Sequence, residues 1–400
     1  MSDLTSPAGP PAEITHLVRE RTEARARHDW PKADELKAQI EAAGWRVVDR
    51  GSRTSVSPAA PATVAVDGEV RYGAASAVAS VLAEPATAAW TVVVLASEQP
   101  DRLSRLLAGL RAHAPAGTQV VVVANDPSDA QTAALAADAP DRAAIAGTVP
   151  EVLRTSTRLG YAAALNIALQ RAGGELVLLT DATAWPTGDA LSPLAAALLD
   201  PDVAAAGAFG LYSAGQGPIR PGALTREPGA DGAAENAAEN AGNGEGPGNG
   251  DGAVGADAML DGAATPEAAA LEGAWLAFRR SDYIELGPLD VHFVTPAWLD
   301  VWWTLRLRAG EEPEGAEYVE TADTDESERA ADAAGTDVPA SEPHTADDEN
   351  GVTMPKPRRA VRLALPLARD EVTWPPDRVR LNRRNMYRVL DRFGWREDLT

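Results

Sequence analysis

The chain has 400 residues, of which 24% are charged, and a formal net charge of -23. This length exceeds that of most single domains and suffices for two. The absence of cysteine excludes disulfides, thiolate metal sites and a cysteine nucleophile. The first residues lack a signal-peptide pattern and the apolar runs are too short to span a membrane, so we expect a cytoplasmic protein.

Two segments carry nearly all of the net charge. Residues 213–270 contain nine acidic residues and two arginines, and residues 311–353 contain fifteen acidic residues and one arginine. Both are rich in glycine, alanine and proline and poor in large apolar residues, a composition that cannot offset the entropy lost on ordering a chain. We predict two disordered acidic insertions in a protein that is otherwise near neutral.

Residues 12–56 have the pattern of a helical hairpin followed by short extended pieces. An apolar stripe begins at Ile14, and a second helix is expected after Asp29, with Pro31 in its first turn and Gly44 as its end. Several arginines and lysines lie along the hairpin.

The same segment resembles the C-terminal tail of cysteinyl-tRNA synthetases. The resemblance rests on Arg-Thr-Glu-Ala-Arg-Ala-Arg-His-Asp-Trp-Pro-Lys-Ala-Asp-Glu-Leu-Lys at residues 21–37 and on Ala-Gly-Trp-Arg-Val-Val-Asp at residues 43–49. It covers about a tenth of the chain, and the catalytic core of the synthetase is missing. The resemblance implies RNA binding through the hairpin, or a hairpin reused as an adaptor.

Residues 57–88 are predicted to form a linker with a short hairpin that turns at Asp67-Gly68. Beyond Trp90, buried strands alternate with helices, which predicts an α/β fold with a mostly parallel sheet. The expected strands are 91–96, 119–124, 175–180 and 203–209, and the expected helices are 101–114, 129–137, 161–172 and 188–199.

Polar residues follow three of these strands. Glu98 follows the first, Asn125 and Asp126 the second, and Asp181 the third. Ligands of such sheets bind at the carboxyl ends of the strands. The glycine motifs of dinucleotide-binding and P-loop proteins are missing, whereas acids in this position suit a diphosphate-sugar donor with a carboxylate-bound divalent cation. The alternative is that these residues only cap the next helices.

Taken in order, the motifs resemble family-2 glycosyltransferases of the GT-A fold, which is Rossmann-like. The resemblance rests on Trp-Thr-Val-Val-Val-Leu-Ala at 90–96, Arg-Leu-Gly-Tyr-Ala-Ala-Ala-Leu-Asn at 158–166, Leu-Leu-Thr-Asp-Ala-Thr at 178–183, Leu-Glu-Gly-Ala-Trp-Leu-Ala-Phe-Arg-Arg at 271–280 and Leu-Asp-Val-Trp-Trp-Thr-Leu-Arg-Leu-Arg-Ala-Gly at 299–310. It implies a nucleotide-sugar-binding half at residues 89–212 and an acceptor and catalytic half at residues 271–310.

The resemblance also implies roles for individual residues. Asp300 corresponds to the general base of an inverting transfer from a nucleotide sugar to a saccharide or lipid-linked acceptor. Asp181 corresponds to the acid that binds the metal or the diphosphate. The other residues on the nucleotide-sugar side are Glu98, Asn125, Asp126, Gly160 and Thr183.

Three departures from the family pattern concern the metal. Thr183 stands where a second acid is expected, and Trp302 replaces the second acid after the base. A histidine beyond the base is often the third ligand, and there the chain offers Asp370, which suits Mg²⁺ or Mn²⁺. These departures leave two alternatives, an active enzyme with Asp181 and Asp370 as metal ligands, or a non-catalytic GT-A-fold binding protein with a decayed donor site.

The C-terminal segment, residues 354–400, is basic and predicts a helix at residues 377–393 that packs on the catalytic domain. Contact with a membrane surface, which would make the protein peripheral, and binding of a polyanion are the alternatives. Near the base, Trp298 and Trp302 share a helix face that suits an acceptor sugar, and the alternative is that these indoles pack in the core.

Overall fold

The computed structural model describes residues 10–50, 53–96, 100–126, 129–137, 145–213, 224–225, 267–310, 356–370, 378–394, 396 and 399. The predicted insertions at residues 213–270 and 311–353 therefore lie mostly outside the described residues.

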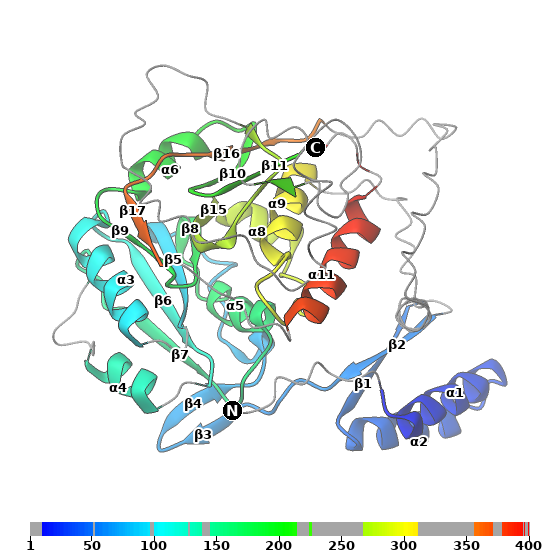
Figure 1. Cartoon of the computed structure of the whole chain (residues 1–400). Coiled ribbons are helices and arrows are strands. Elements are labelled where there is room, and N and C mark those ends of the chain that lie inside the picture. The colour runs from blue at the N-terminus through cyan, green and yellow to red at the C-terminus, as the bar shows by residue number, and fades with distance from the viewer. Residues whose placement is uncertain are drawn as a thin grey trace.

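The N-terminal module consists of two helices and a two-stranded hairpin, which lie to one side of the main body (Figure 1). Its elements are α1 (Ala12–Ala26), α2 (Trp30–Ala42), β1 (Trp45–Arg50) and β2 (Arg53–Pro58). The Asp29 side chain accepts a hydrogen bond from the backbone N–H of Lys32 and so caps α2, with Pro31 in the first turn. Gly44, at φ +81°, ends the helix in the left-handed region that favours glycine. The predicted hairpin is thus present.

A partly buried ion pair joins α1 to β1. The Arg21 guanidinium, whose side chain is 5% exposed, donates to both carboxylate oxygens of Asp49 at 2.9 and 2.6 Å. The Thr54 hydroxyl also donates to Asp49, and Arg25 lies 3.2 Å from it. The hydrogen bond from Arg21 is the main reason why the pKa of Asp49 falls to about 2. Two basic residues of the hairpin are therefore engaged inside the module.

We expect acidification to loosen this module. Because the folded pKa of Asp49 lies below its unfolded value near 3.9, the stabilisation is complete above about pH 4 and is lost as the pH falls toward 2. The loss amounts to about 2 kcal/mol. Hydrogen exchange of peptides from residues 12–58 in the full chain, at neutral pH, should be faster in Asp49→Asn than in the exposed control Asp34→Asn. Equal exchange in both variants would contradict the role of the pair.

Ten strands of the described residues form one mixed sheet in the order β13-β16-β10-β15-β8-β5-β6-β7-β4-β3. The central pairs β8–β5, β5–β6 and β6–β7 are parallel, whereas β15 is antiparallel to both β8 and β10. The strands are β3 (Val64–Val66), β4 (Glu69–Tyr72), β5 (Ala88–Ala96), β6 (Gln119–Ala124), β7 (Glu151–Thr155), β8 (Gly174–Thr180), β10 (Val203–Gly207), β13 (Glu267–Ala268), β15 (Leu276–Arg279) and β16 (Arg359–Arg362). The predicted α/β fold with a mostly parallel sheet is confirmed.

Helices cover both faces of this sheet (Figure 1). One face carries α3 (Pro100–His113), α4 (Asp129–Ala137) and α6 (Leu191–Leu198). The other carries α5 (Tyr161–Leu169), α8 (Arg280–Leu286), α9 (Leu299–Ala309) and α11 (Arg378–Phe393). Strands β5 and β6 are buried on both faces of the sheet. Because both faces need apolar side chains, these strands contain continuous runs of valine instead of an alternating pattern.

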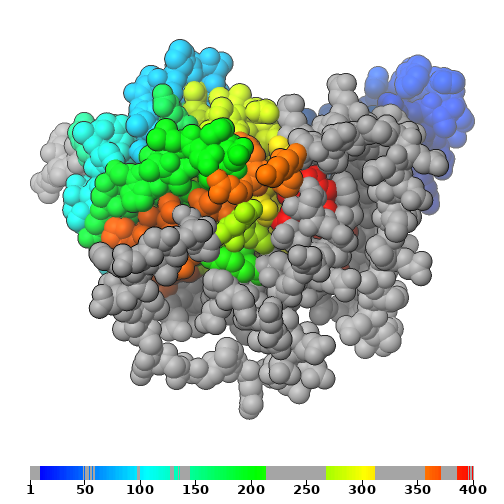
Figure 2. All heavy atoms as spheres, turned by 90° about the horizontal axis from the view of Figure 1, so that it is seen from above, coloured from blue at the N-terminus to red at the C-terminus, as the bar shows by residue number. Residues whose placement is uncertain are grey.

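Short elements complete the body. They are η1 (Ala75–Ala77), β9 (Ala184–Pro186), β11 (Gly210–Ser213), β12 (Leu224–Thr225), β14 (Ala270–Leu271), η3 (Gly273–Trp275) and β17 (Leu367–Arg369). Seen from above, the orange segment that contains β16 lies against the green segment that contains α6 and β10 (Figure 2). The chain thus returns to the sheet after residue 356 and pairs β16 with β10 in parallel.

Two predicted boundaries are wrong. The hairpin within residues 57–88 is not part of a linker, because β4 pairs in parallel with β7 and extends the main sheet. The first insertion is too wide, because β12 pairs with β11, and β13 pairs with β16. Backbone pairing with other strands orders these short segments, although their own composition favours disorder.

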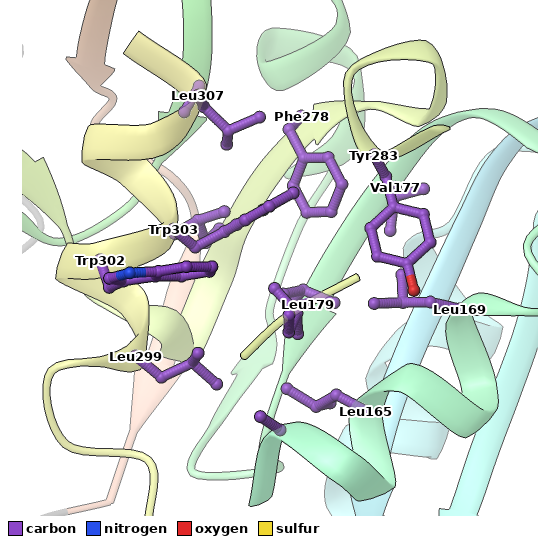
Figure 3. Packing of buried hydrophobic residues seen from close by; sticks show 14 of the residues in the cluster. Leu165, Leu169, Val177, Leu179, Phe278, Tyr283, Leu299, Trp302, Trp303 and Leu307 are labelled. Carbon is purple, nitrogen blue, oxygen red and sulfur yellow. The ribbon is translucent and has the colours of Figure 1, made fainter. Parts of the chain in front are cut away.

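Aromatic side chains fill the core beneath α9 (Figure 3). Trp303 is 1% exposed and meets Phe278 edge-on, with ring centroids 5.4 Å apart. It also meets Tyr283 edge-on at 6.0 Å. Helix α11 packs against the same core through Val389 and Phe393, both fully buried. The apolar face of the basic helix therefore packs on the body of the protein.

Within the part of the chain that the structure describes, no helix is both long and apolar enough to cross a membrane.

Candidate functional site

A cavity of about 400 Å³ opens beside the carboxyl end of β8. Three carboxylates and one guanidinium line it together with apolar side chains: Asp181, Glu272, Asp300 and Arg369. Asp181 follows β8, Glu272 follows β14, Asp300 lies in the first turn of α9, and Arg369 ends β17. Its volume is within the range of small-molecule sites. The fold thus brings the two aspartates singled out in the sequence, Asp181 and Asp300, to one cavity.

Asp300 is held by two backbone donors. Its Oδ2 accepts from the N–H of Gly273 at 2.9 Å, and its Oδ1 accepts from the N–H of Val301 at 2.9 Å. Burial raises the pKa of Asp300 to about 6, the charge of Glu272 adds to the rise, and the two N–H groups oppose it. A carboxyl group with such a pKa exchanges protons near neutral pH, as a general base must.

The backbone around Asp300 is tightly arranged. A Cβ on Gly273 would lie 3.2 Å from the Cβ of Asp300, so a side chain there would press on the base. Trp298, which precedes α9, has φ +67°, a conformation that costs energy for a bulky residue and that persists where the surroundings impose it. Helix α9 therefore starts from a strained residue at the cavity.

Asp181 lies in a tight turn at the end of β8. Its Oδ1 accepts from the backbone N–H of Thr183 at 3.0 Å and from the Thr183 hydroxyl at 2.6 Å. Ala182, between them, has φ +67°. Thr183 therefore supports Asp181 and does not act as a second acid.

Tyr161, at the start of α5, lines the cavity with the two aspartates. Burial, followed by the charges of Asp181 and Asp300, raises the pKa of Tyr161 well above its usual value of 10. The phenol therefore stays protonated and is a hydrogen-bond donor near both carboxylates.

Glu272 and Arg369 form an ion pair at the cavity. The Arg369 Nη2 lies 2.8 Å from the Glu272 Oε2, and their side chains are 31% and 10% exposed. The guanidinium also lies over the Phe209 ring, 4.2 Å from its centroid. This stacking and the ion pair fix the orientation of the arginine.

Asp370 is paired away from the cavity. Its carboxylate lies 2.7 Å from the Arg102 Nε and 2.7 Å from the Arg105 Nη2, both on α3. Burial opposes ionisation, but the hydrogen bonds from Arg105 and Arg102 outweigh it and lower the pKa of Asp370. The oxygens of Asp370, which was predicted as a metal ligand, are thus engaged by two arginines, and the residue does not line the cavity.

The acids do not fit a bound divalent cation. Of the predicted ligands, Asp181 has one oxygen engaged by Thr183, and Asp370 faces α3. Among the described residues, no three histidine, aspartate or glutamate side chains come together as a metal site would require. We therefore derive no step through a metal.

The remaining predicted residues lie outside the lining of the cavity. The Asn125 side chain donates to the Leu159 carbonyl and accepts from the Leu159 N–H, at 2.9 and 2.8 Å, and so holds the loop before α5. The Asp126 N–H donates to the Thr155 hydroxyl.

Gly160 permits a close approach, but to Val294 of the chain itself. A Cβ on Gly160 would lie 3.2 Å from the Val294 Cα. Gly160 therefore accommodates a contact within the chain, and the approach to a donor implied by the resemblance stays a prediction.

The predicted residue Glu98 lies outside the described residues.

The three tryptophans near the base separate into two groups. Trp302 and Trp303 are 5% and 1% exposed and belong to the core, although Trp303 also lines the cavity. Trp298 is only partly buried and lines the cavity. A face shared by Trp298 and Trp302 is thus not available to a sugar, because the next turn of α9 is covered by the body of the protein.

Tyr161, Glu272 and Arg369 were missed as site residues. Tyr161 and Glu272 lie inside the motifs at residues 158–166 and 271–280, and this position in the motifs is the signal that the sequence offers. Arg369 gives no such signal, because only the pairing of β17 with β9 brings it to the cavity.

Comparison with known families agrees with both resemblances. Residues 91–244 match the family model described as glycosyl transferase family 2, and residues 8–56 match that of the cysteinyl-tRNA ligase anticodon binding domain. No curated protein sequence matches the chain.

Two solved structures to which the chain is similar are a mannosyltransferase and the protein TarS. One is the mannosyltransferase PcManGT from Pyrobaculum calidifontis in complex with GDP-Man and Mn²⁺, at 20% identity and a TM-score of 0.37, over 58% of this chain and 55% of that chain. The other is S. aureus TarS in complex with UDP, at 16% identity and a TM-score of 0.35, over 55% of this chain and 54% of that chain. The match spans about half the length of each structure.

Proposed function

We propose, from the glycosyl transferase family 2 segment that the chain carries at residues 91–244, that the protein transfers a sugar from a nucleotide-diphosphate sugar to an acceptor hydroxyl with inversion. The observation that carries the proposal is the cavity that joins Asp181 to Asp300, a carboxylate with a pKa of about 6. An acid held by backbone donors in a partly buried site is suited to accept a proton.

In the proposed reaction Asp300 is the general base. It takes the proton of the acceptor hydroxyl while that oxygen bonds to the anomeric carbon of the donor. The bond from this carbon to the diphosphate oxygen breaks, and its electron pair leaves with the nucleoside diphosphate. One displacement of this kind inverts the anomeric centre. Asp181 and the protonated Tyr161 face the same cavity and would bind hydroxyl groups of the donor.

The rate of transfer should depend on pH through Asp300. Because its pKa is raised to about 6, the basic form prevails only above that pH. We expect the rate at saturating donor to rise about tenfold per pH unit below 6 and to level off above it. A log-rate profile between pH 5 and 8 measures this, and a flat profile would contradict Asp300 as the base.

The proposed function is tested with a panel of UDP-, GDP- and dTDP-sugars. Release of nucleoside diphosphate is followed with and without simple sugar acceptors, and thermal unfolding reports donor binding independently of turnover. We expect one class of donor to bind and to be turned over. Binding without turnover would favour the alternative, a GT-A-fold binding protein, for which Thr183 in place of a second acid is the supporting observation. Neither binding nor turnover with any donor would refute both.

A further inference from the structure

Among the described residues that line the cavity, Arg369 is the only cation. Strand β17 pairs antiparallel with β9 and sets Arg369 opposite Ala184. The N–H of the next residue, Asp370, donates to the Thr183 carbonyl at 2.8 Å. The backbone therefore fixes the guanidinium beside the turn that carries Asp181.

The Arg369 guanidinium is fixed in orientation, and some of its N–H groups are still able to donate hydrogen bonds. Glu272 engages one of its terminal nitrogens at 2.8 Å, and Phe209 stacks on its plane. An arginine has five N–H donors in a planar fork, so this one can keep its contact with Glu272 and still donate to an anion. Its side chain is 31% exposed, which leaves it accessible from the cavity.

The charge in the cavity requires such a group. Asp181, Glu272 and Asp300 are acidic, and a diphosphate would add further negative charge to them. In a partly buried site this repulsion is strong unless a cation offsets it. Among the described residues no set of acids is arranged to hold a metal ion, and Asp370 is occupied by Arg102 and Arg105.

We propose that Arg369, oriented by Glu272 and Phe209, binds the diphosphate of the nucleotide sugar and provides the positive charge that a metal ion would otherwise provide. This rests on the proposed function. When the bond between the anomeric carbon and the diphosphate oxygen breaks, the electron pair moves to the diphosphate, and Arg369 stabilises the resulting charge by hydrogen bonds. The proton of the acceptor passes to Asp300, so the arginine changes neither protonation nor bonding.

Isothermal titration of the full chain with UDP, GDP and dTDP, in EDTA and then in Mn²⁺, tests the proposal. For the nucleotide that binds, the affinity should be the same within about twofold in both buffers, and Arg369→Gln should weaken it about 10- to 100-fold. Asp181→Asn removes a carboxylate that a metal ion would need but keeps a hydrogen-bonding side chain, so it should weaken the affinity much less than Arg369→Gln does. Arg359→Gln is the matched control, because Arg359 forms a surface ion pair with Asp200 at 2.6 Å and does not line the cavity.

The outcomes separate this inference from the proposed function. Binding that requires Mn²⁺, disappears in Asp181→Asn and persists in Arg369→Gln would overturn the role of Arg369 and leave the proposed function standing. No binding of any nucleoside diphosphate in either buffer would overturn both. If a thermal scan shows that Arg369→Gln is not folded at the temperature of the titration, the variant Arg369→Lys replaces it in the test. It keeps the charge without the fork, so an affinity below that of the wild type and unaffected by Mn²⁺ supports the proposal, whereas wild-type affinity refutes it.

Discussion

Replacing Asp300 by asparagine is expected to lower the rate of sugar transfer by about 10²- to 10⁴-fold, the usual contribution of a general base. The amide oxygen can still accept the N–H of Gly273, which now donates to the carboxylate at 2.9 Å, whereas the amide nitrogen cannot accept the N–H of Val301. An amide cannot take up the acceptor proton at neutral pH. The affinity for the nucleoside diphosphate should therefore remain while turnover falls.

The stability of Asp300→Asn provides a second test. A carboxyl group whose folded pKa lies above its unfolded value opposes folding once it ionises, so stability decreases as the pH rises from about 4 through 6. Asparagine removes this charge but also loses the hydrogen bond from the Val301 N–H, so the stability of the variant relative to the wild type should be higher at pH 7 than at pH 4.

Two controls accompany this variant. Asp200→Asn removes a surface carboxylate that pairs with Arg359, and it should leave turnover unchanged. Turnover of Asp300→Asn within about threefold of the wild type would refute the assignment of the base, since a general base contributes far more than this.

Replacing Trp303 by alanine is expected to destabilise the main body by about 3–5 kcal/mol, the range for removing a large aromatic side chain from a packed core. The indole is 1% exposed and contacts Phe278, Tyr283 and Trp302 from one turn of α9. A cavity there would loosen the helix that carries Asp300. Urea unfolding followed by circular dichroism measures the loss.

Trp303→Phe separates packing from polarity. The indole N–H of Trp303 is buried without a hydrogen-bond partner among the described residues, and burying such a group already costs stability. Phenylalanine restores much of the ring volume without this donor, so it should cost less than half of what alanine costs. Leu199→Ala, at an 83% exposed position, is the control and should change stability by less than about 0.5 kcal/mol. A similar effect for Trp303→Ala and Leu199→Ala would contradict the proposed packing.

The sequence determined those features whose cause is local. The strands β5, β6 and β8 follow from unbroken apolar runs, and the Asp29 cap and the turn at Asp67-Gly68 follow from residues that favour those conformations. The positions of Asp181 and Asp300 in one cavity follow from family motifs together with the rule that ligands bind at the carboxyl ends of strands.

Only the tertiary structure decided what surrounds these acids. The antiparallel strand β15 inserts between β8 and β10 and brings Glu272 and Gly273 to Asp300, a pairing between segments far apart in the chain. The sequence pointed to Asp370, whereas its neighbour Arg369 is the residue that lines the cavity. Successive side chains of an extended chain point to opposite sides, so β17 directs Arg369 into the cavity and Asp370 toward α3. The register of β17 is fixed by its pairing with β9. A shift by one residue would turn Asp370 instead of Arg369 toward the cavity.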